Sequence, residues 1–372
     1  MIYPHSRTAR VRLVPAHMVL MGIEFIPDKP VSTIVDWSQL AEKVGFDHVW
    51  ITDHYNNRNL WCTLTAIALN TSHVKIGPGV TNPYHASPAL SAAAAVTLNE
   101  ISGGRAVVGM GAGDRVTLET LGLEWRRPVT TVVESIKCMR ALMNGERLSM
   151  SGKVFTFRQA RLSMVPQTEL RDADGTTVSR DGKSVKIAPY IPIYAGAQGP
   201  MMLRSVAPLV DGILINASHP KDFEAAIRSI KRGLSGTPRQ ISELDIGAYA
   251  AFSIGQDREE ALSGMTRLVV AFIVAGSPDA VIERHDLQNG EREKIAQMLE
   301  RGDFRGARNA VTDEMIEIFA IAGDRDYCIE RIDQLLKQGV THFVVGSPIG
   351  QDKSEAIRRI GQDIIPYFKE NA

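Results

Sequence analysis

Cysteine is scarce in this sequence, since the 372 residues contain only Cys62, Cys138 and Cys328. Three widely spaced cysteines exclude a disulfide framework and lack the paired spacing of a zinc site. We therefore expect reduced, mostly buried thiols in a cytoplasmic protein without a metal centre.

Long apolar runs are also missing, because none approaches the ~20 residues that a membrane-spanning helix needs. Residues 1–20 carry Arg7, Arg10 and Arg12 but lack the long apolar core and cleavage site of a signal peptide. The apolar residues after position 18 continue into a strand-like stretch. We expect residues 1–17 to form an N-terminal extension and the protein to have no membrane partner.

The sequence has no excess of charge of either sign, because 42 Lys and Arg residues balance 42 Asp and Glu residues. Binding to a nucleic-acid backbone requires a surplus of basic residues, so the balance argues against a nucleic-acid partner. A small anionic ligand held by a few backbone N–H groups remains compatible with it.

Short apolar runs alternate with helical patterns along the whole chain. Eight runs have strand character, which is the number that closes a parallel (β/α)8 barrel. A helical stretch that ends at Gly45 is followed by a strand, and the same order recurs at Gly339. The expected strands span residues 19–25, 48–52, 74–80, 106–110, 191–194, 212–215, 245–254 and 342–345.

Two segments interrupt this alternation and are expected to be insertions. Residues 111–190 are too long for one connection and include a helical run at 132–143 and a polar, turn-rich stretch at 168–186. Residues 272–312 follow a long apolar helix at 268–275 and contain short charged helices. We expect one barrel domain, residues 18–372, that carries both insertions.

Polar residues and glycines gather where the expected strands end, which is where βα barrels place their active sites. Glu24 is flanked by apolar residues, and an acid is rarely buried without a partner or a function. The other candidates are Asp53 and His54 after the second strand, Gly79, Val80, Thr81 and Asn82 after the third, Asp114 after the fourth, and Gly196, Ala197, Gln198 and Gly199 after the fifth.

Each of these candidates also has a structural explanation. Glu24 is compatible with a salt-bridged strand end, and Asp53 with a helix N-cap. Glycines at positions 109, 111 and 113 have the wrong spacing for a dinucleotide-binding turn. The segment 196–200 fits either a simple turn or an anion site at a helix start. No hydrolase, nucleotide-binding or metalloprotease motif is present, and the histidines lack metal-ligand spacing.

Several segments in order resemble the F420-dependent methylenetetrahydromethanopterin reductases of archaeal one-carbon metabolism, which belong to the bacterial-luciferase-like superfamily. The resemblance runs from residue 22 to the C-terminus. Its segments include GIEF at 22–25, WITDHYNN at 50–57, GPGVTNPY at 77–84 and GAQGPMM at 196–202, and continue at 215–218, 220–225, 270–273 and 346–350.

The resemblance implies a (β/α)8 barrel, a homo-oligomer (dimer or tetramer) and coenzyme F420 bound at the carboxyl ends of the strands. It places a non-proline cis peptide at Gly79-Val80, behind the deazaflavin ring, and matches Glu24 and Asp114 to the family's acidic positions. The implied pocket residues are Asp53, His54, Thr81, Asn82 and Gln198, and the segment 196–199 is the implied seat of an anionic part of the cofactor.

The implied reaction transfers a hydride from the reduced deazaflavin to methylene-tetrahydromethanopterin, giving the methyl product. Protonation of a substrate nitrogen makes it a better leaving group, which is a task for Glu24 with a raised pKa. Asp114, if close, is expected to separate the pKa values of the two acids further.

Four alternatives stay open at this point. A tetrahydrofolate-type pterin, or an alcohol or sugar phosphate oxidised with F420, would use the same barrel. A flavin monooxygenase of the superfamily would bind FMN and consume oxygen. A non-catalytic flavin-binding barrel would have no need for a buried acid at its mouth.

Overall fold

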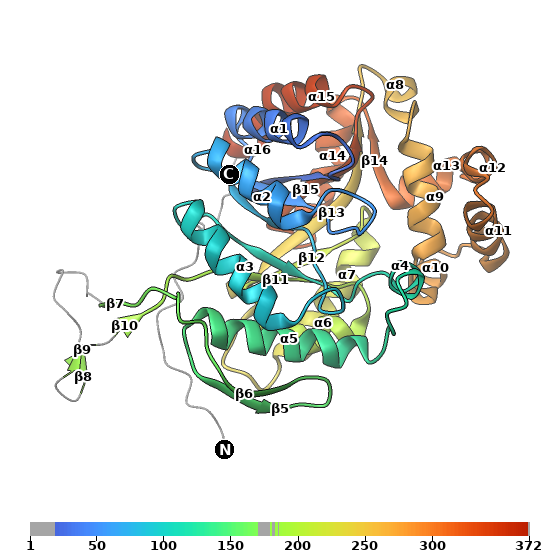
Figure 1. The fold of residues 1–372 in the computed structure, drawn as a ribbon. Helices are drawn as coiled ribbons and strands as arrows, with labels where there is room; N and C mark the ends of the chain where they lie inside the picture. Colours follow the sequence, from blue (N-terminus) through green and yellow to red (C-terminus); the bar gives the residue numbers. More distant parts are fainter. Residues whose placement is uncertain (1–18, 170–178, 181–182, 185, 371–372) are drawn as a thin grey trace.

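The computed structural model describes residues 19–169, 179–180, 183–184 and 186–370, and its centre is a parallel β-barrel (Figure 1). The strands lie in the order β3-β2-β1-β15-β13-β12-β11-β4. Single parallel bridges join Ile76 to Ala106 and Thr81 to Met110, which brings β3 beside β4 and closes the ring. The barrel strands are β1 (Leu20–Phe25), β2 (His48–Ile51), β3 (Lys75–Pro78), β4 (Val108–Met110), β11 (Ile193–Gly196), β12 (Gly212–Ile215), β13 (Asp245–Ile254) and β15 (His342–Ile349).

These strands fall within or overlap all eight predicted runs, so the predicted (β/α)8 barrel is confirmed. A ninth strand, β14 (Ala320–Gly323), was not among the predicted strands. It pairs in parallel with the last four residues of the long strand β13 and lies outside the ring. The ninth strand is possible because β13 extends beyond the segment that its barrel neighbour β12 covers.

Helices surround the barrel and pack apolar faces against it. The first of them, α1, ends at Gly45, whose φ of 101° is the left-handed conformation that favours glycine at this position. Gly339, with a φ of 94°, follows α14 in the same conformation. The surrounding helices are α1 (Val31–Val44), α2 (Leu60–Asn70), α3 (Pro88–Ile101), α5 (Pro128–Met143), α6 (Pro200–Val206), α7 (Pro220–Leu234), α14 (Arg325–Lys337), α15 (Lys353–Arg359) and, after a π-helical turn (Ile360–Ile364), α16 (Ile365–Glu370).

The first predicted insertion contains α4 (Arg115–Thr120), α5 and a β-hairpin formed by β5 (Leu148–Ser151) and β6 (Thr156–Ala160). Two further two-residue strand pairs follow it. They are β7 (Thr168–Glu169) with β10 (Lys186–Ile187) and β8 (Ser179–Arg180) with β9 (Lys183–Ser184). The predicted N-terminal extension, residues 1–17, and most of the polar stretch 168–186 lie outside the described residues.

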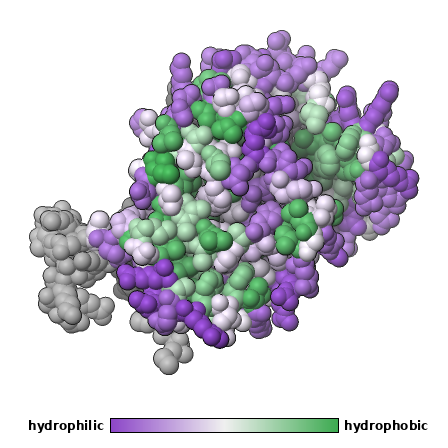
Figure 2. All heavy atoms as spheres, in the orientation of Figure 1, coloured by the Kyte–Doolittle hydropathy of each residue, from purple (hydrophilic) through white to green (hydrophobic). Residues whose placement is uncertain are grey.

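The second predicted insertion, residues 272–312, falls within a run of helices over residues 258–319 that lies beside the barrel, at the right of Figure 1. Its helices bury a hydrophobic cluster of their own, which includes Val270, Ile282 and Met315. Phe272 on α9 remains about half exposed. Figure 2 shows an apolar patch on this side of the molecule. The helices are α8 (Arg258–Leu262), α9 (Thr266–Gly276), α10 (Asp279–Arg284), α11 (Asn289–Glu300), α12 (Phe304–Ala310) and α13 (Asp313–Phe319).

The amino-terminal half of the barrel interior is polar. The Asp245 carboxylate accepts hydrogen bonds from the Tyr194 hydroxyl (2.9 Å) and lies 2.9 Å from Nδ1 of His342. His48 stacks on Trp50, and burial lowers its pKa well below the ordinary value. This cluster fills the barrel floor and leaves the opposite end for a site. No helix in the described part of the chain is long and apolar enough to cross a membrane.

We predict that Gly77→Ala destabilises the protein by at least about 2 kcal/mol, because overpacking between strands forces the backbone apart. A Cβ at position 77 would collide with the backbone carbonyl of Val107, where β3 approaches β4. The control is Gly276→Ala at the exposed end of α9, where a Cβ has nothing within 4 Å. Urea-unfolding midpoints measure both variants, and equal midpoints would contradict the packing argument.

Candidate functional site

Glu24 is a buried acid near the carboxyl end of β1, with only 8% of its surface exposed. Its Oε2 accepts a hydrogen bond from the backbone N–H of Ser347 (2.9 Å), at the end of the neighbouring strand β15. Burial raises the pKa of Glu24, while the Ser347 N–H and the Lys353 charge lower it by less, so the pKa is raised. The carboxyl group is therefore suited to hold a proton at a higher pH than an exposed glutamate.

The peptide bond between Gly79 and Val80 is cis, as the resemblance implied. Tyr249, on β13, donates its hydroxyl to the Gly79 carbonyl (2.9 Å) from across the barrel. The same hydroxyl is under the influence of Glu24, because burial first and the Glu24 charge second raise its pKa well above the ordinary value. Tyr249 therefore holds the cis peptide at 79–80, which we call the bulge after β3.

Glycines of the next two strands make room for the Val80 side chain. A Cβ on Gly111 would lie 2.6 Å from Val80 Cγ2, and one on Gly196 would lie 3.0 Å from the same atom. A Cβ on Gly109 would lie 2.7 Å from Cγ1. The bulge after β3 thus rests directly on the ends of β4 and β11, and the predicted cofactor residues Val80 and Gly196 are neighbours.

Asp53 is held by the residues that follow the bulge. Its Oδ2 accepts a hydrogen bond from the Thr81 hydroxyl (2.6 Å) and lies 3.6 Å from Nδ1 of His85. Asn82, which is buried, accepts from the backbone N–H groups of Tyr84 and His85 and contacts the same His85 nitrogen (3.0 Å). The structure thus joins the candidates after the second and third strands in one hydrogen-bonded cluster.

Asp114 and His54 lie at the exposed rim. Asp114 is the N-cap of the short helix α4 and accepts from the Thr117 backbone N–H (2.7 Å). Partial desolvation by the surrounding protein lowers the pKa of His54, and the charges of Asp53 and Asp114 partly offset this effect. The pKa of Glu24 is set by its burial, Ser347 and Lys353, so the expected coupling between Asp114 and Glu24 stays a prediction.

The segment 196–199 connects β11 to α6. Gly199 is the N-cap of α6 and has open space where a Cβ would point. The Gln198 side chain donates to the backbone carbonyl of Asn216, in the loop that follows β12. This hydrogen bond therefore joins the loops that follow β11 and β12, beside the bulge.

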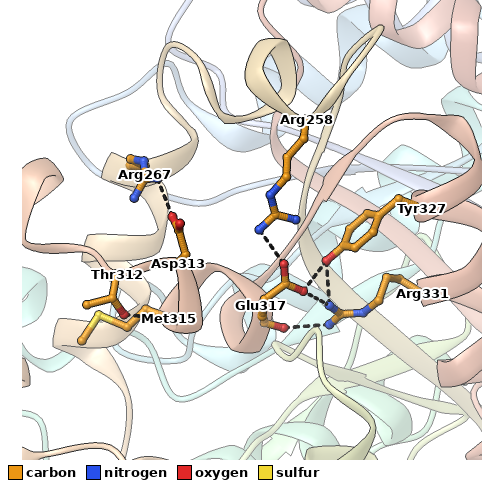
Figure 3. A network of polar contacts seen from close by, with 8 residues as sticks. All are labelled: Arg258, Arg267, Thr312, Asp313, Met315, Glu317, Tyr327 and Arg331. Carbon is orange, nitrogen blue, oxygen red and sulfur yellow. Dashed lines mark hydrogen bonds and ion pairs between the residues drawn. The ribbon is translucent and has the colours of Figure 1, made fainter.

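A network of charges lies behind the loop after β12 (Figure 3). Arg331 of α14 donates to Glu317 Oε2 (2.8 Å) and to the Ser218 backbone carbonyl (3.1 Å). Arg258 and the Tyr327 hydroxyl donate to the same carboxylate. Burial raises the pKa of Glu317, but the hydrogen bonds from Tyr327 and Arg258 and the arginine charges lower it by more. The network holds Ser218 in place. Asn216, whose carbonyl accepts from Gln198, lies in the same loop.

Three buried polar atoms around the mouth lack a hydrogen-bond partner within the described part of the protein. They are Thr52 Oγ1, Ser347 Oγ and His85 Nε2. Buried polar groups are normally paired, so unpaired ones at a barrel mouth fit a ligand with several polar atoms. A polar ring system supported by the Val80 bulge and bordered by Glu24 meets this description. Over the described residues, no cluster of three or more His, Cys, Asp or Glu side chains is arranged to hold a metal ion.

Tyr249, His85 and Lys353 were not predicted from the sequence. Tyr249 lies within a strand, and only the alternation of residues along β13 could have suggested that it faces the interior. His85 comes directly after the 77–84 motif. Lys353 begins α15, and its Nζ lies 5.0 Å from the centre of the Trp37 ring.

The chain matches a family described as "Luciferase-like monooxygenase" over residues 7–342. It is 48% identical to a 5,10-methylenetetrahydromethanopterin reductase of Archaeoglobus fulgidus, over 94% of this chain and 99% of the relative. It is 42% identical to the protein of the same name from Methanopyrus kandleri, over 95% and 99% of the two chains.

Solved structures share the fold. The coenzyme F420-dependent tetrahydromethanopterin reductase from Methanopyrus kandleri superposes with a TM-score of 0.83 at 40% identity, covering 95% of this chain and all of that one. An F420-dependent secondary alcohol dehydrogenase in complex with an F420-acetone adduct gives a TM-score of 0.72 over 93% and 98% of the two chains. Its identity of 21% makes it a likeness of fold alone.

We predict that Glu24→Gln raises the melting temperature above pH 7 and leaves it unchanged near pH 4. The raised pKa means that the folded protein binds more protons than the unfolded chain, so wild-type stability falls as pH rises from the ordinary glutamate pKa. A neutral glutamine avoids this loss and still accepts from Ser347. Thermal unfolding between pH 4 and pH 8 measures the difference.

The control for this prediction is Glu134→Gln, whose pKa shift has the opposite sign. Burial raises the pKa of Glu134, but the backbone N–H groups of Phe155, Lys153 and Val154 lower it by more. Its contribution to stability is therefore present above the ordinary glutamate pKa and lost as pH falls through the lowered value. E134Q should lower the melting temperature at pH 7, and a shift of the same sign in both variants would refute the assignment.

We predict that Arg331→Met destabilises the protein by about 3 kcal/mol, because it removes the buried guanidinium that donates to Glu317 Oε2 and to the backbone carbonyls of Ser218 and Glu317. The control is Arg258→Met, which removes a half-exposed partner of the same carboxylate and should lower stability by no more than about 1 kcal/mol. Urea midpoints of the two variants compare them, and similar losses would contradict a structural role for Arg331.

Proposed function

The chain belongs to the luciferase-like monooxygenase family and, within it, to the 5,10-methylenetetrahydromethanopterin reductases, and from this membership we propose its reaction. The protein transfers a hydride between reduced coenzyme F420 and methylene-tetrahydromethanopterin, giving methyl-tetrahydromethanopterin, in a reversible reaction. When bound, coenzyme F420 supplies the hydride, and the protein aligns the reactants and handles the proton.

The buried acid Glu24 is the observation that carries this proposal. Its Oε2 is occupied by the Ser347 N–H, so the proton resides at Oε1, which remains available to a substrate nitrogen. Protonation of that nitrogen helps the bond to the one-carbon unit break, because a neutral amine is a better leaving group than an amide anion. Burial favours the protonated form of the carboxyl group, because it raises the pKa.

The neighbouring residues are assigned to binding and orientation. Gly79, Val80, Thr81 and Asn82 form the support behind the deazaflavin ring, and Gly196, Ala197, Gln198 and Gly199 receive the anionic part of the cofactor. The unpaired hydroxyl groups of Thr52 and Ser347 are donors for polar atoms of the bound molecules. Asp53 and His54 complete the pocket, and Asp114 supplies a second acidic group at its rim.

We propose a homo-oligomer in the cytoplasm for the assembled enzyme, with residues 18–372 as a single barrel domain. A tetrahydrofolate-type substrate remains the alternative pterin. Absorption and fluorescence spectra of the purified protein mixed with F420 and with FMN separate the deazaflavin enzyme from a flavin monooxygenase. Binding of FMN in place of F420 would overturn the proposed cofactor.

We predict that Glu24→Gln lowers kcat by roughly 10²- to 10⁴-fold, which is the usual contribution of a general acid. The dissociation constant of F420, followed by its fluorescence, should change by less than about twofold, because glutamine preserves the shape of the site. Steady-state turnover with methylene-tetrahydromethanopterin measures the loss.

Glu134→Gln makes the same chemical change on α5, outside the barrel mouth, and should keep kcat within about twofold of wild type. Near-wild-type turnover of E24Q with intact cofactor binding would remove Glu24 from the mechanism. If weaker binding of F420 fully explains the lower turnover of E24Q, Glu24 is a binding residue and not the general acid.

A further inference from the structure

A groove of about 200 Å³ lies between α6, α7 and α10, outside the barrel mouth. Figure 1 shows these three helices close together, where the insertion meets the barrel. The groove borders the candidate cofactor loops, because Gln198 and Pro200 after β11 and Ala217 after β12 are among its lining residues. A ligand seated on those loops therefore lies beside the groove.

The groove is strongly basic. Four arginines line it, namely Arg204 of α6, Arg228 and Arg232 of α7, and Arg284 of α10, and Asp222 is the one acidic residue in its lining. Arg228 and Arg232 are four positions apart on one helix and so share a face. A concentration of positive charge of this kind stands out in a chain whose net charge is zero.

Two of these arginines have a structural partner. Arg284 pairs with Asp222, which also lies 3.0 Å from Nε2 of the buried His285. Arg228 lies 3.8 Å from Glu224, and both side chains are largely exposed. An exposed pair at this distance contributes little to stability, so Arg228 remains available to another anion.

Arg204 and Arg232 have no carboxylate within ion-pair distance over the described parts of the chain. Both are exposed, and both face the same groove from different helices. Two guanidinium groups that line one groove from different helices, with no ion-pair partner among the described residues, match a ligand that carries several carboxylates, because each group can bind a carboxylate through two parallel N–H donors.

We propose that this groove binds the carboxylate-bearing tail of coenzyme F420, with Arg204 and Arg232 as its principal contacts. The inference rests on the proposed function, because the deazaflavin and its phosphate must first occupy the barrel mouth. The tail then leaves the 196–199 loop past Gln198 and runs between α6 and α7. Affinity for the cofactor thus depends on the glutamate residues of its tail as well as on the ring.

The test compares three probes by deazaflavin fluorescence, namely F420 with several glutamates, F420 without glutamates, and the chromophore without phosphate. Wild type should bind the glutamate-bearing form about 5- to 10-fold more tightly than the form without glutamates, as expected for two added charge pairs. This preference should shrink at high salt, because exposed ion pairs are screened.

The double variant R204Q/R232Q should lose this preference and bind the two shorter probes as wild type does. The matched control is R301Q/R305Q, which removes two exposed arginines from the helical insertion and should keep the preference. Equal affinity of wild type for the two F420 forms would overturn the proposal that the groove binds the tail. An equal loss of affinity for all three probes in R204Q/R232Q would overturn it as well. If wild type binds none of the probes, the proposed cofactor itself is wrong and the groove assignment is overturned with it.

Discussion

Close packing around Val80 is the constraint on which the geometry of the barrel mouth depends. The side chain occupies a space left by the missing Cβ atoms of Gly109, Gly111 and Gly196, so the strands β4 and β11 meet the end of β3 at van der Waals distance. An alanine at any of these glycines would displace a stiff β-branched side chain. The position of the bulge, and of the cofactor loop beside it, is thereby fixed by the packing of three strands.

The acid on the other side of the mouth is balanced between opposing influences. Burial favours the neutral form of Glu24, while the Ser347 N–H and Lys353 favour the charged form. Lys353 is itself affected by its surroundings, because burial lowers its pKa and the charges of Asp28 and Glu24 only partly offset that effect. A group placed in this way reduces stability at neutral pH, and such a loss is characteristic of a residue retained for function.

Much of this arrangement could be predicted from local sequence patterns. The eight strands and the glycines that end α1 and α14 follow from hydrophobic periodicity and turn chemistry, and the cis peptide followed from the family resemblance. Strand β14 could not be predicted in this way, because its four residues acquire strand geometry only by pairing with the extended end of β13. Tyr249 likewise depends on a contact with Gly79, 170 residues away in the sequence, and no local motif marks it.

The balanced composition conceals an uneven use of arginine. Arg105 is buried, and carbonyl groups of the backbone stabilise its charge. Its guanidinium donates to the carbonyls of Ala68, Thr71, Val74 and Ser102. Arg331 is used in the same way by Ser218 and Glu317. Arg204 and Arg232 lie at the surface beside the loops assigned to the cofactor, and among the described residues no carboxylate pairs with them. A chain of zero net charge can therefore offer a local anion site, because arginines such as Arg105 and Arg331 bind carbonyl and carboxylate groups of the fold itself.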